Sequence, residues 1–267
     1  MRVAVVTGAS SGIGAELVRQ LRARSWHTVG LSRRASETDE HEECDVSDRA
    51  WVDTAAAQVL ERHPQIDLLV NNAGIPGRAR GFVDVDPERL EQVVATNFLG
   101  NVWVTRAFLP GLGAGSHIVN VVSVAGEIAD GPYSATKHAQ LALSRSLAVE
   151  LAPRGISVHT VKPGFVETPG FPQRGVQFGP FASKLVVDPP FVVGRILDAV
   201  EHDRREITVP LVPAGGGPPG GCSRVVRAPP RPLQRVRRYQ PMTCSYPGGA
   251  SSRARSRSGP SQPARSR

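Results

Sequence analysis

Tyr133 and Lys137 lie four residues apart in the string YSATK, within a stretch whose pattern predicts a helix. Residues at positions i and i+4 share one helix face, so the lysine ammonium can lie beside the phenol. A cation about 4 Å away would lower a tyrosine pKa from near 10 to roughly 7–9. Such a tyrosine can exchange protons near neutral pH, as a general acid and base must. The same pair is also typical of ordinary surface packing, so other motifs must show whether these two residues are catalytic.

The string TGASSGIG, from Thr7 to Gly14, follows an apolar run and opens a predicted helix. Its glycines permit a tight turn and a close approach of phosphate to the backbone, and the helix N-terminus presents free N–H groups. In this strand–turn–helix context the pattern predicts a dinucleotide pyrophosphate site. A plain glycine turn is the alternative interpretation.

The elements that must position these residues alternate between short β-branched runs and helical patterns up to about residue 210. Helix starts are indicated by Ser47, by Asp86 before Pro87, and by Asp188 before Pro189, with the Asp86 helix running to about Phe108. Because the strand runs are apolar throughout, we expect an α/β fold, a Rossmann-like doubly wound parallel sheet. Strands are predicted at Val3–Val6, His27–Leu31, Ile66–Val70, His117–Val122, Ile156–Val161 and Glu206–Val209, with a weaker one near Glu43–Cys44.

The net charge of +8 belongs to one end of the chain of 267 residues. Residues 213–267 hold eleven arginines and no acidic residue, and the first 212 residues carry 21 basic and 24 acidic side chains. We expect a dinucleotide-binding and catalytic domain at 1–212 and a disordered tail rich in Arg, Pro, Gly and Ser at 213–267. A second hypothesis for the tail is a change of reading frame near residue 212.

Other compositional features exclude several classes of protein. No run of about 18 apolar residues exists, so we expect no membrane span, and the first residues do not resemble a secretory signal. Cys44, Cys222 and Cys244 lack metal-ligand spacing, so we expect no metal site, no disulfide framework and a cytoplasmic location. Arginines in the tail could contact nucleic-acid phosphates, but with only two tyrosines there we expect a solvated tail instead.

Six motifs occur in one order: TGASSGIG, NNAG at Asn71–Gly74, Asn97 in ATNFLG, Ser123 in VSVAG, YSATK, and Pro163–Gly164. Over about residues 1–210 the chain resembles a short-chain dehydrogenase/reductase. That resemblance implies a seven-stranded sheet and hydride transfer between a nicotinamide cofactor and a carbonyl or alcohol. It also implies homodimers or homotetramers, built through the helices at Asp86–Phe108 and Tyr133–Leu151.

The resemblance assigns roles to four catalytic residues. Tyr133 would be the acid/base, and Lys137 would lower its pKa and hold the ribose hydroxyls. Ser123 would hydrogen-bond the substrate oxygen, and Asn97 would anchor a water that links Lys137 to solvent. Cofactor contacts are expected from Gly8, Ser10, Ser11, Gly12, Ile13, Gly14, Arg33, Asp45, Val46, Asn71, Ala73, Gly74, Tyr133, Lys137, Pro163, Gly164, Val166 and Thr168.

The residues after the second predicted strand favour NADP over NAD. NAD-binding units place an acid about 20 residues past the glycines, whereas an arginine there accommodates the 2′-phosphate of NADP. Here the strand ends GLSRR, and Arg33 stands where an acid would otherwise be. The alternative is that the arginines point into solvent. For Asp45, contact with the adenine and capping of the next helix are both open.

Two departures from the family pattern bear on activity. Ser123 and Tyr133 are ten residues apart, about three fewer than is common, so Ser123 could be displaced. The end of the chain replaces a segment that borders the substrate pocket in the family. An NADP-binding sensor or scaffold is therefore the alternative to an enzyme. Phe165, Phe171, Phe178 and Phe181 suggest a small apolar carbonyl or alcohol as substrate, and Arg174 is the one candidate for an anionic group.

Overall fold

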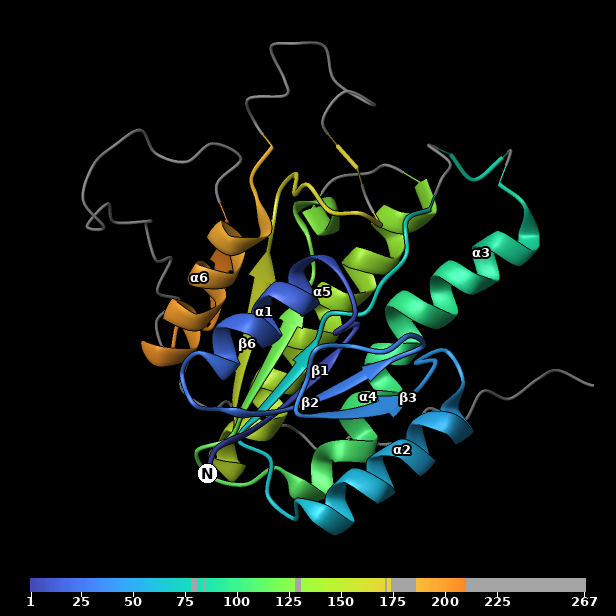
Figure 1. Ribbon diagram of the computed structural model, residues 1–267. Coiled ribbons are helices and arrows are strands. Elements are labelled where there is room, and N and C mark those ends of the chain that lie inside the picture. Colours follow the sequence, from blue (N-terminus) through green and yellow to red (C-terminus); the bar gives the residue numbers. More distant parts are fainter. Residues whose placement is uncertain (78–80, 84, 128–130, 171, 174–185, 210–267) are drawn as a thin grey trace, which may run out of the picture. The chain divides into compact units, whose positions relative to one another are not determined.

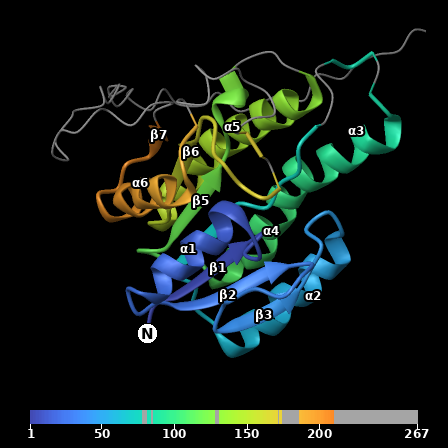
Figure 2. The same cartoon turned by 45° about the horizontal axis from the view of Figure 1, so that its top comes forward.

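Seven parallel strands form one sheet in the computed structural model, which describes residues 1–77, 81–83, 85–127, 131–170, 172–173 and 186–209. The strand order is β3-β2-β1-β4-β5-β6-β7, so β3 and β7 are the edges (Figures 1 and 2). This order confirms the predicted doubly wound α/β fold. The strands are β1 (Val3–Thr7), β2 (His27–Ser32), β3 (Glu40–Glu43), β4 (Leu68–Asn71), β5 (His117–Val121), β6 (Ser157–Lys162) and β7 (Glu206–Thr208).

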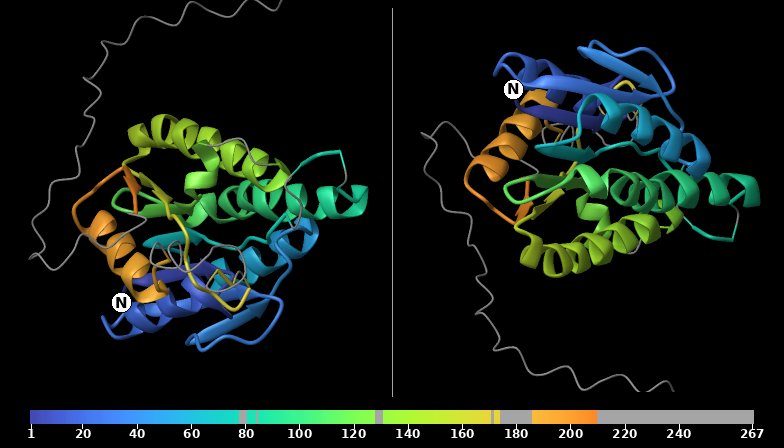
Figure 3. Two further views of the ribbon diagram at one scale, coloured as in Figure 1. Left: turned by 90° about the horizontal axis from the view of Figure 1, so that it is seen from above. Right: turned by 90° about the horizontal axis from the view of Figure 1, so that it is seen from below.

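Helices cover both faces of the sheet, as Figure 3 shows from above and below. One face carries α1 (Gly12–Arg22) and α6 (Pro189–Glu201), which pack on each other. The other carries α2 (Arg49–Arg62), α4 (Gly100–Phe108) and α5 (Gly131–Leu151). The remaining elements are α3 (Pro87–Val94), η1 (Ala95–Leu99), η2 (Leu109–Gly111), η3 (Val124–Glu127) and η4 (Ala152–Arg154).

Each central strand supplies two separate cores. Along β1, Val3 and Val5 point to the core under α2 and α4, whereas Ala4 and Val6 point to the core under α1 and α6. Successive side chains of a strand alternate between faces, so a strand covered on both sides has no polar face. That is why these runs read as uniformly apolar in the sequence.

The helix starts correct one expectation and refine another. Asp48, not Ser47, is the N-cap of α2, and its carboxylate accepts a hydrogen bond from the Trp51 N–H. Ser47 instead donates its hydroxyl to Asp45, which leaves the next acceptor along the chain to cap the helix. Asp86 caps α3 as predicted, but the helix it opens changes to a π-helical turn, η1, before continuing as α4.

The predicted domain boundary at residues 212 and 213 lies outside the described residues, the last of which is Val209, so it stays a prediction. Residues Met1–Gly217 form one compact unit. The predicted tail at 213–267 lies outside the described residues, as do Phe171, Arg174, Phe178 and Phe181 of the predicted substrate region. Within the described ranges, no helix is both long and apolar enough to cross a membrane.

Candidate active site

The predicted motifs meet at one end of the sheet, because all strands of a parallel sheet have their carboxyl ends on the same side, here called the carboxyl edge. The glycine turn follows β1, NNAG begins with the last residue of β4, Ser123 follows β5, and Pro163–Gly164 follows β6 (Figure 1). Ligands of open α/β sheets bind at this edge. The fold therefore gathers the motifs into one candidate site.

Backbone geometry explains the glycines of the turn after β1. Gly8 and Gly12 have φ of +66° and +58°, in the left-handed region where a side chain is strained. A Cβ on Gly14 would lie 2.3 Å from the Gly8 carbonyl oxygen, so only glycine lets α1 pack against the turn. Ser11 stands at the N-cap of α1 without a side-chain hydrogen bond to the helix, which leaves the first N–H groups of α1 to a ligand.

Other residues predicted to contact the cofactor border this turn. A Cβ on Gly12 would lie 3.1 Å from the Thr168 methyl, so the chain after β6 passes directly over the turn. Val166 in that segment pairs with Val187 in an isolated bridge, which fixes its course. Ser10 is half-buried, and Ile13 packs against the core beneath α1. The glycine turn and the start of α1 together form a cradle that has no room for a Cβ and presents N–H donors. These properties fit a pyrophosphate.

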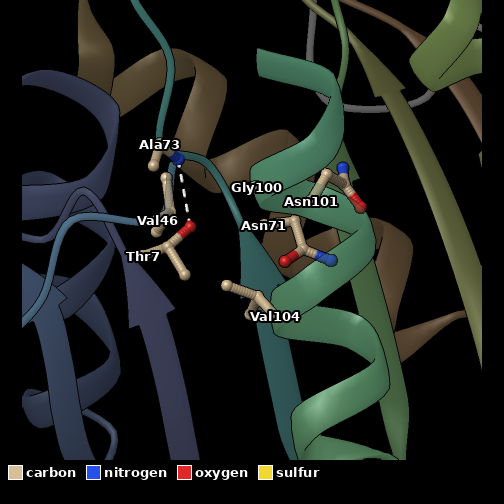
Figure 4. Close-up of a pocket in the computed structure, with 7 residues that line it drawn as sticks. All are labelled: Thr7, Val46, Asn71, Ala73, Gly100, Asn101 and Val104. Atoms are coloured by element: carbon tan, nitrogen blue, oxygen red, sulfur yellow. Dashed lines mark hydrogen bonds between the residues drawn. The ribbon is translucent and has the colours of Figure 1, made fainter. Parts of the chain in front are cut away.

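Thr7, which was not among the predicted site residues, joins the glycine turn to NNAG. Its hydroxyl oxygen accepts the N–H group of Ala73 at 3.0 Å (Figure 4). It also accepts the N–H group of Asn72 at 2.9 Å, and the hydroxyl donates to the Val70 carbonyl at 3.2 Å. A threonine at the last position of a strand before a glycine turn was the available signal. Gly74 follows, and a Cβ on it would lie 3.3 Å from the Asn97 Oδ1 atom.

Asn71 begins a buried polar chain that crosses from β4 to β6. Its amide donates to Thr105 and Asn120, each at 2.9 Å, and Asn120 donates in turn to Ser144, which lies 2.6 Å from Thr160. The Asn71 Oδ1 atom itself faces a small hollow beside Thr7 and Val104 and has no hydrogen-bond partner in the described part of the chain (Figure 4). Asn71 thus links β4 to α4 and β5 beneath the site, and its contact with a cofactor stays a prediction.

Arg33 and Asp45 face each other beyond the ends of β2 and β3. The Arg33 Nη1 atom lies 3.5 Å from the Asp45 carboxylate, and the Arg33 side chain is 66% exposed. Although partial burial works against ionisation, hydrogen bonds from Ser47 and the charge of Arg33 lower the pKa of Asp45. Asp45 does not cap α2, so that alternative was wrong. Val46 is buried against Gly100, where a Cβ would come within 2.9 Å of it.

Ser123 and Tyr133 meet despite the short segment between them. Their side chains are hydrogen-bonded to each other, so the ten-residue spacing does not displace Ser123 from the phenol. The Ser123 Oγ atom also accepts the Ala125 N–H at 3.1 Å and lies 3.4 Å from the Pro163 carbonyl. The Ser123 hydroxyl, which follows β5, and the Tyr133 phenol of α5 therefore lie together beside the Pro163–Gly164 turn.

The expected effect of Lys137 on Tyr133 is not found in this structure. Burial raises the pKa of Tyr133 to about 12, an effect that its hydrogen bond with Ser123 opposes. Burial also lowers the pKa of Lys137 to about 7. The Lys137 Nζ atom lies 5.5 Å from the phenol ring centroid and donates to the Val121 carbonyl at 3.2 Å. A distant and partly neutral amine cannot offset the desolvation of the phenol.

Asn97 holds the segment after NNAG against α5. In the π-helical turn η1 it is fully buried, and it exchanges two hydrogen bonds with the Ile75 backbone, at 2.8 and 3.0 Å. Its amide also donates to Thr136 on α5 at 3.2 Å. The side chain therefore links the helix of Tyr133 and Lys137 to the segment that follows NNAG. A role in holding water stays a prediction.

An ion-pair network beside Ser123 was missed by the sequence reasoning. Lys162 ends β6 with its side chain only 8% exposed, and its Nζ atom lies 2.7 Å from both Glu127 and Glu206. Glu206 also pairs with Arg145 of α5 at 2.7 Å. Charged residues at strand ends gave no signal of their own, because their partners lie far away in the sequence. The network ties η3, which follows Ser123, to the edge of the sheet.

Comparisons with known proteins agree with this arrangement. The family model described as short chain dehydrogenase matches residues 2–175. The chain is 37% identical over 190 residues to 2-(R)-hydroxypropyl-CoM dehydrogenase of Xanthobacter autotrophicus, covering 63% of this chain and 76% of that protein.

Two solved structures resemble it along most of their length. A short-chain dehydrogenase from Burkholderia cenocepacia in complex with NADP has a TM-score of 0.72 and 26% identity, covering 79% of this chain and 97% of that one. A single-substitution variant of actinorhodin polyketide ketoreductase with NADPH has a TM-score of 0.68 and 28% identity, covering 78% and 95%.

Fold, motif order and family model together define the class. The chain belongs to the short-chain dehydrogenase/reductase family of oxidoreductases.

Proposed function

We propose that this protein is an NADP-dependent oxidoreductase that interconverts a carbonyl and a secondary alcohol, with Tyr133 as acid/base. The observation that carries the proposal is the hydrogen-bonded pair Ser123 and Tyr133 beside the buried Lys137. These groups lie at the strand ends where the glycine cradle would hold a dinucleotide. The nicotinamide, when bound, supplies or accepts the hydride.

The residues of the chain then handle the proton and the charge on oxygen. Hydride arriving at a carbonyl carbon leaves negative charge on the oxygen, and the Ser123 and Tyr133 hydroxyls are donors placed together for it. In the reduction direction Tyr133 gives its proton to that oxygen. Because burial raises its pKa to about 12, the phenol is protonated at neutral pH, which is the form that reduction requires.

Binding of the cofactor is assigned to the residues that form the cradle and its rim. The N–H groups at the start of α1 would receive the pyrophosphate, and Lys137 would hold the ribose hydroxyls. Arg33 would receive the 2′-phosphate, since its exposed guanidinium lies 3.5 Å from Asp45 and is held there only loosely. Relatives solved with NADP and with NADPH support this choice.

The test is a titration with NADPH and NADH followed by a panel of ketones, aldehydes and secondary alcohols. We expect NADPH to bind more tightly and at least one small apolar carbonyl to be reduced. Ser123→Ala should then lower kcat roughly 10²–10³-fold, as loss of one donor to a developing oxyanion does. Cofactor binding without turnover on the whole panel would favour a sensor or scaffold instead.

A further inference from the structure

A cluster of two histidines and a glutamate lies at the end of the sheet opposite the candidate active site. His27 starts β2, Glu40 starts edge strand β3, and His63 follows the last turn of α2 (Figure 2). The Glu40 Oε1 atom lies 2.8 Å from the His27 Nε2 and 2.7 Å from the His63 Nε2. The three side chains are only 15–27% exposed, so the cluster is not an ordinary solvated surface.

The atoms that converge here are those that a zinc-like ion prefers. Imidazole nitrogen and carboxylate oxygen bind Zn²⁺ at about 2.0–2.2 Å, which separates neighbouring ligand atoms by about 3.4 Å in a tetrahedral site. The present N···O separations would have to open by about 0.6 Å. Water can supply the fourth ligand, because all three side chains are still partly exposed to solvent.

Neighbouring side chains orient the ligand atoms but do not occupy them. Arg62 binds the other oxygen of Glu40, Oε2, at 2.9 Å and also pairs with Glu42, so Oε1 stays directed at the two imidazoles. A ligating carboxylate is commonly held in this way by an outer partner. Although partial burial works against ionisation, hydrogen bonds from His63, His27 and Arg62 hold the pKa of Glu40 at about 2.

The tautomers of the two histidines are free to adapt. Neither Nδ1 atom makes a hydrogen bond with the described part of the chain, so no second contact locks the proton on Nε2. Each ring can therefore carry its proton on Nδ1, which leaves the Nε2 lone pair for a metal. The second histidine pair differs: His159 Nδ1 faces the Arg204 carbonyl and His159 Nε2 lies 2.9 Å from His117. Those two rings already satisfy each other, and their nearby Asp203 pairs with Arg205.

We propose that His27, Glu40 and His63 bind one divalent transition-metal ion of the Zn²⁺ type. The ion would join the edge strand β3 and the end of α2 to β2. The site stands at the amino ends of β2 and β3, away from the cofactor motifs at the carboxyl ends. Its role is therefore structural, and it is independent of the proposed oxidoreductase activity.

The experiment is a Zn²⁺ titration of the untagged full-length chain after treatment with EDTA, followed by calorimetry and by thermal unfolding. Wild type should bind one equivalent and unfold at a higher temperature with zinc than without it. His63→Gln should weaken that binding about 100-fold or more, since losing even an outer partner costs roughly 10–100-fold. Arg62→Gln, which removes the outer partner, should weaken it roughly 10–100-fold.

His117→Gln is the matched control, because it removes a half-buried histidine from the second cluster. It should bind zinc as wild type does. Equal zinc affinity in wild type and His63→Gln would overturn the proposal, as would a loss confined to His117→Gln. Any zinc bound by cysteines elsewhere in the chain would be the same in every variant, so it does not affect the difference between them. Should His63→Gln fail to fold, imidazole NMR of the wild type decides: unmoved His27 and His63 resonances on zinc addition would refute the site.

Discussion

At the scale of single residues, the strongest chemical constraint is the burial of Lys137. Lys137 is only 4% exposed, and this burial lowers the pKa of its amine from 10.5 to about 7. In the cofactor-free chain at pH 8 the amine is therefore mostly neutral. A bound dinucleotide with ribose hydroxyls and phosphates nearby would favour the ammonium form.

Cofactor binding should consequently take up protons. We expect NADPH binding at pH 8 to absorb up to one proton, and less at pH 6, where the ammonium is already formed. Calorimetry in buffers of different ionisation enthalpy measures this uptake. Lys137→Met should abolish it, and the same uptake in that variant would show that another group titrates.

Arg33 should determine the choice between NADPH and NADH. A charged hydrogen-bonded contact contributes about 1.5–3 kcal/mol, so Arg33→Ala should weaken NADPH roughly 10- to 100-fold. NADH affinity should change little, and Arg33→Asp should reverse the preference. Arg34→Asp, at the second arginine of GLSRR, is the control and is expected to have the smaller effect. NADH binding as tightly as NADPH in wild type would contradict the assignment.

At the scale of elements, two helical glycines should respond in opposite ways to replacement by alanine. A Cβ on Gly14 of α1 would meet the Gly8 backbone oxygen at 2.3 Å, whereas one on Gly194 of α6 would meet nothing within 4 Å. Gly14→Ala should therefore destabilise the fold by about 1–3 kcal/mol through overpacking against backbone. Gly194→Ala should stabilise it by about 0.5–1 kcal/mol. Urea unfolding of both variants checks this, and equal effects would mean that the turn yields.

The strands and the order of the motifs were predictable because they depend on local pattern. Uniformly apolar runs such as Val3–Val6 are typical of strands covered on both faces. The N-cap of α2 was misplaced by one residue because Ser47 and Asp48 are both good caps. The π-helical turn at Asn97 was not predictable, since it depends on the tertiary contacts of that side chain with Ile75 and Thr136.

The electrostatics of the site could not be predicted from spacing alone. The i, i+4 rule placed Lys137 near Tyr133, but the pKa of the phenol depends on burial that only the packed chain defines. The same limit hid the Lys162 network and the His27–Glu40–His63 cluster. Their members are brought together by the sheet, not by any sequence interval.

At the scale of the whole molecule, every cofactor motif precedes residue 170 and lies in the compact unit Met1–Gly217. The composition of residues 213–267 predicts a disordered tail with eleven arginines. Limited trypsin treatment should then cut this segment first and leave a domain that binds NADPH as tightly as the full chain. A tail that resists trypsin, or a trimmed domain that loses the cofactor, would require a revised boundary.

The central claim is that the Tyr133 hydroxyl transfers the proton. Its most direct test compares wild type with Tyr133→Phe, measuring NADPH affinity and the rate of carbonyl reduction in the same preparation. The ring still packs without its hydroxyl, so cofactor affinity should stay within a few-fold. Turnover should fall roughly 10²–10⁴-fold, as loss of general acid catalysis does. Near-wild-type turnover in Tyr133→Phe, with the variant folded and NADPH bound, would contradict the mechanism.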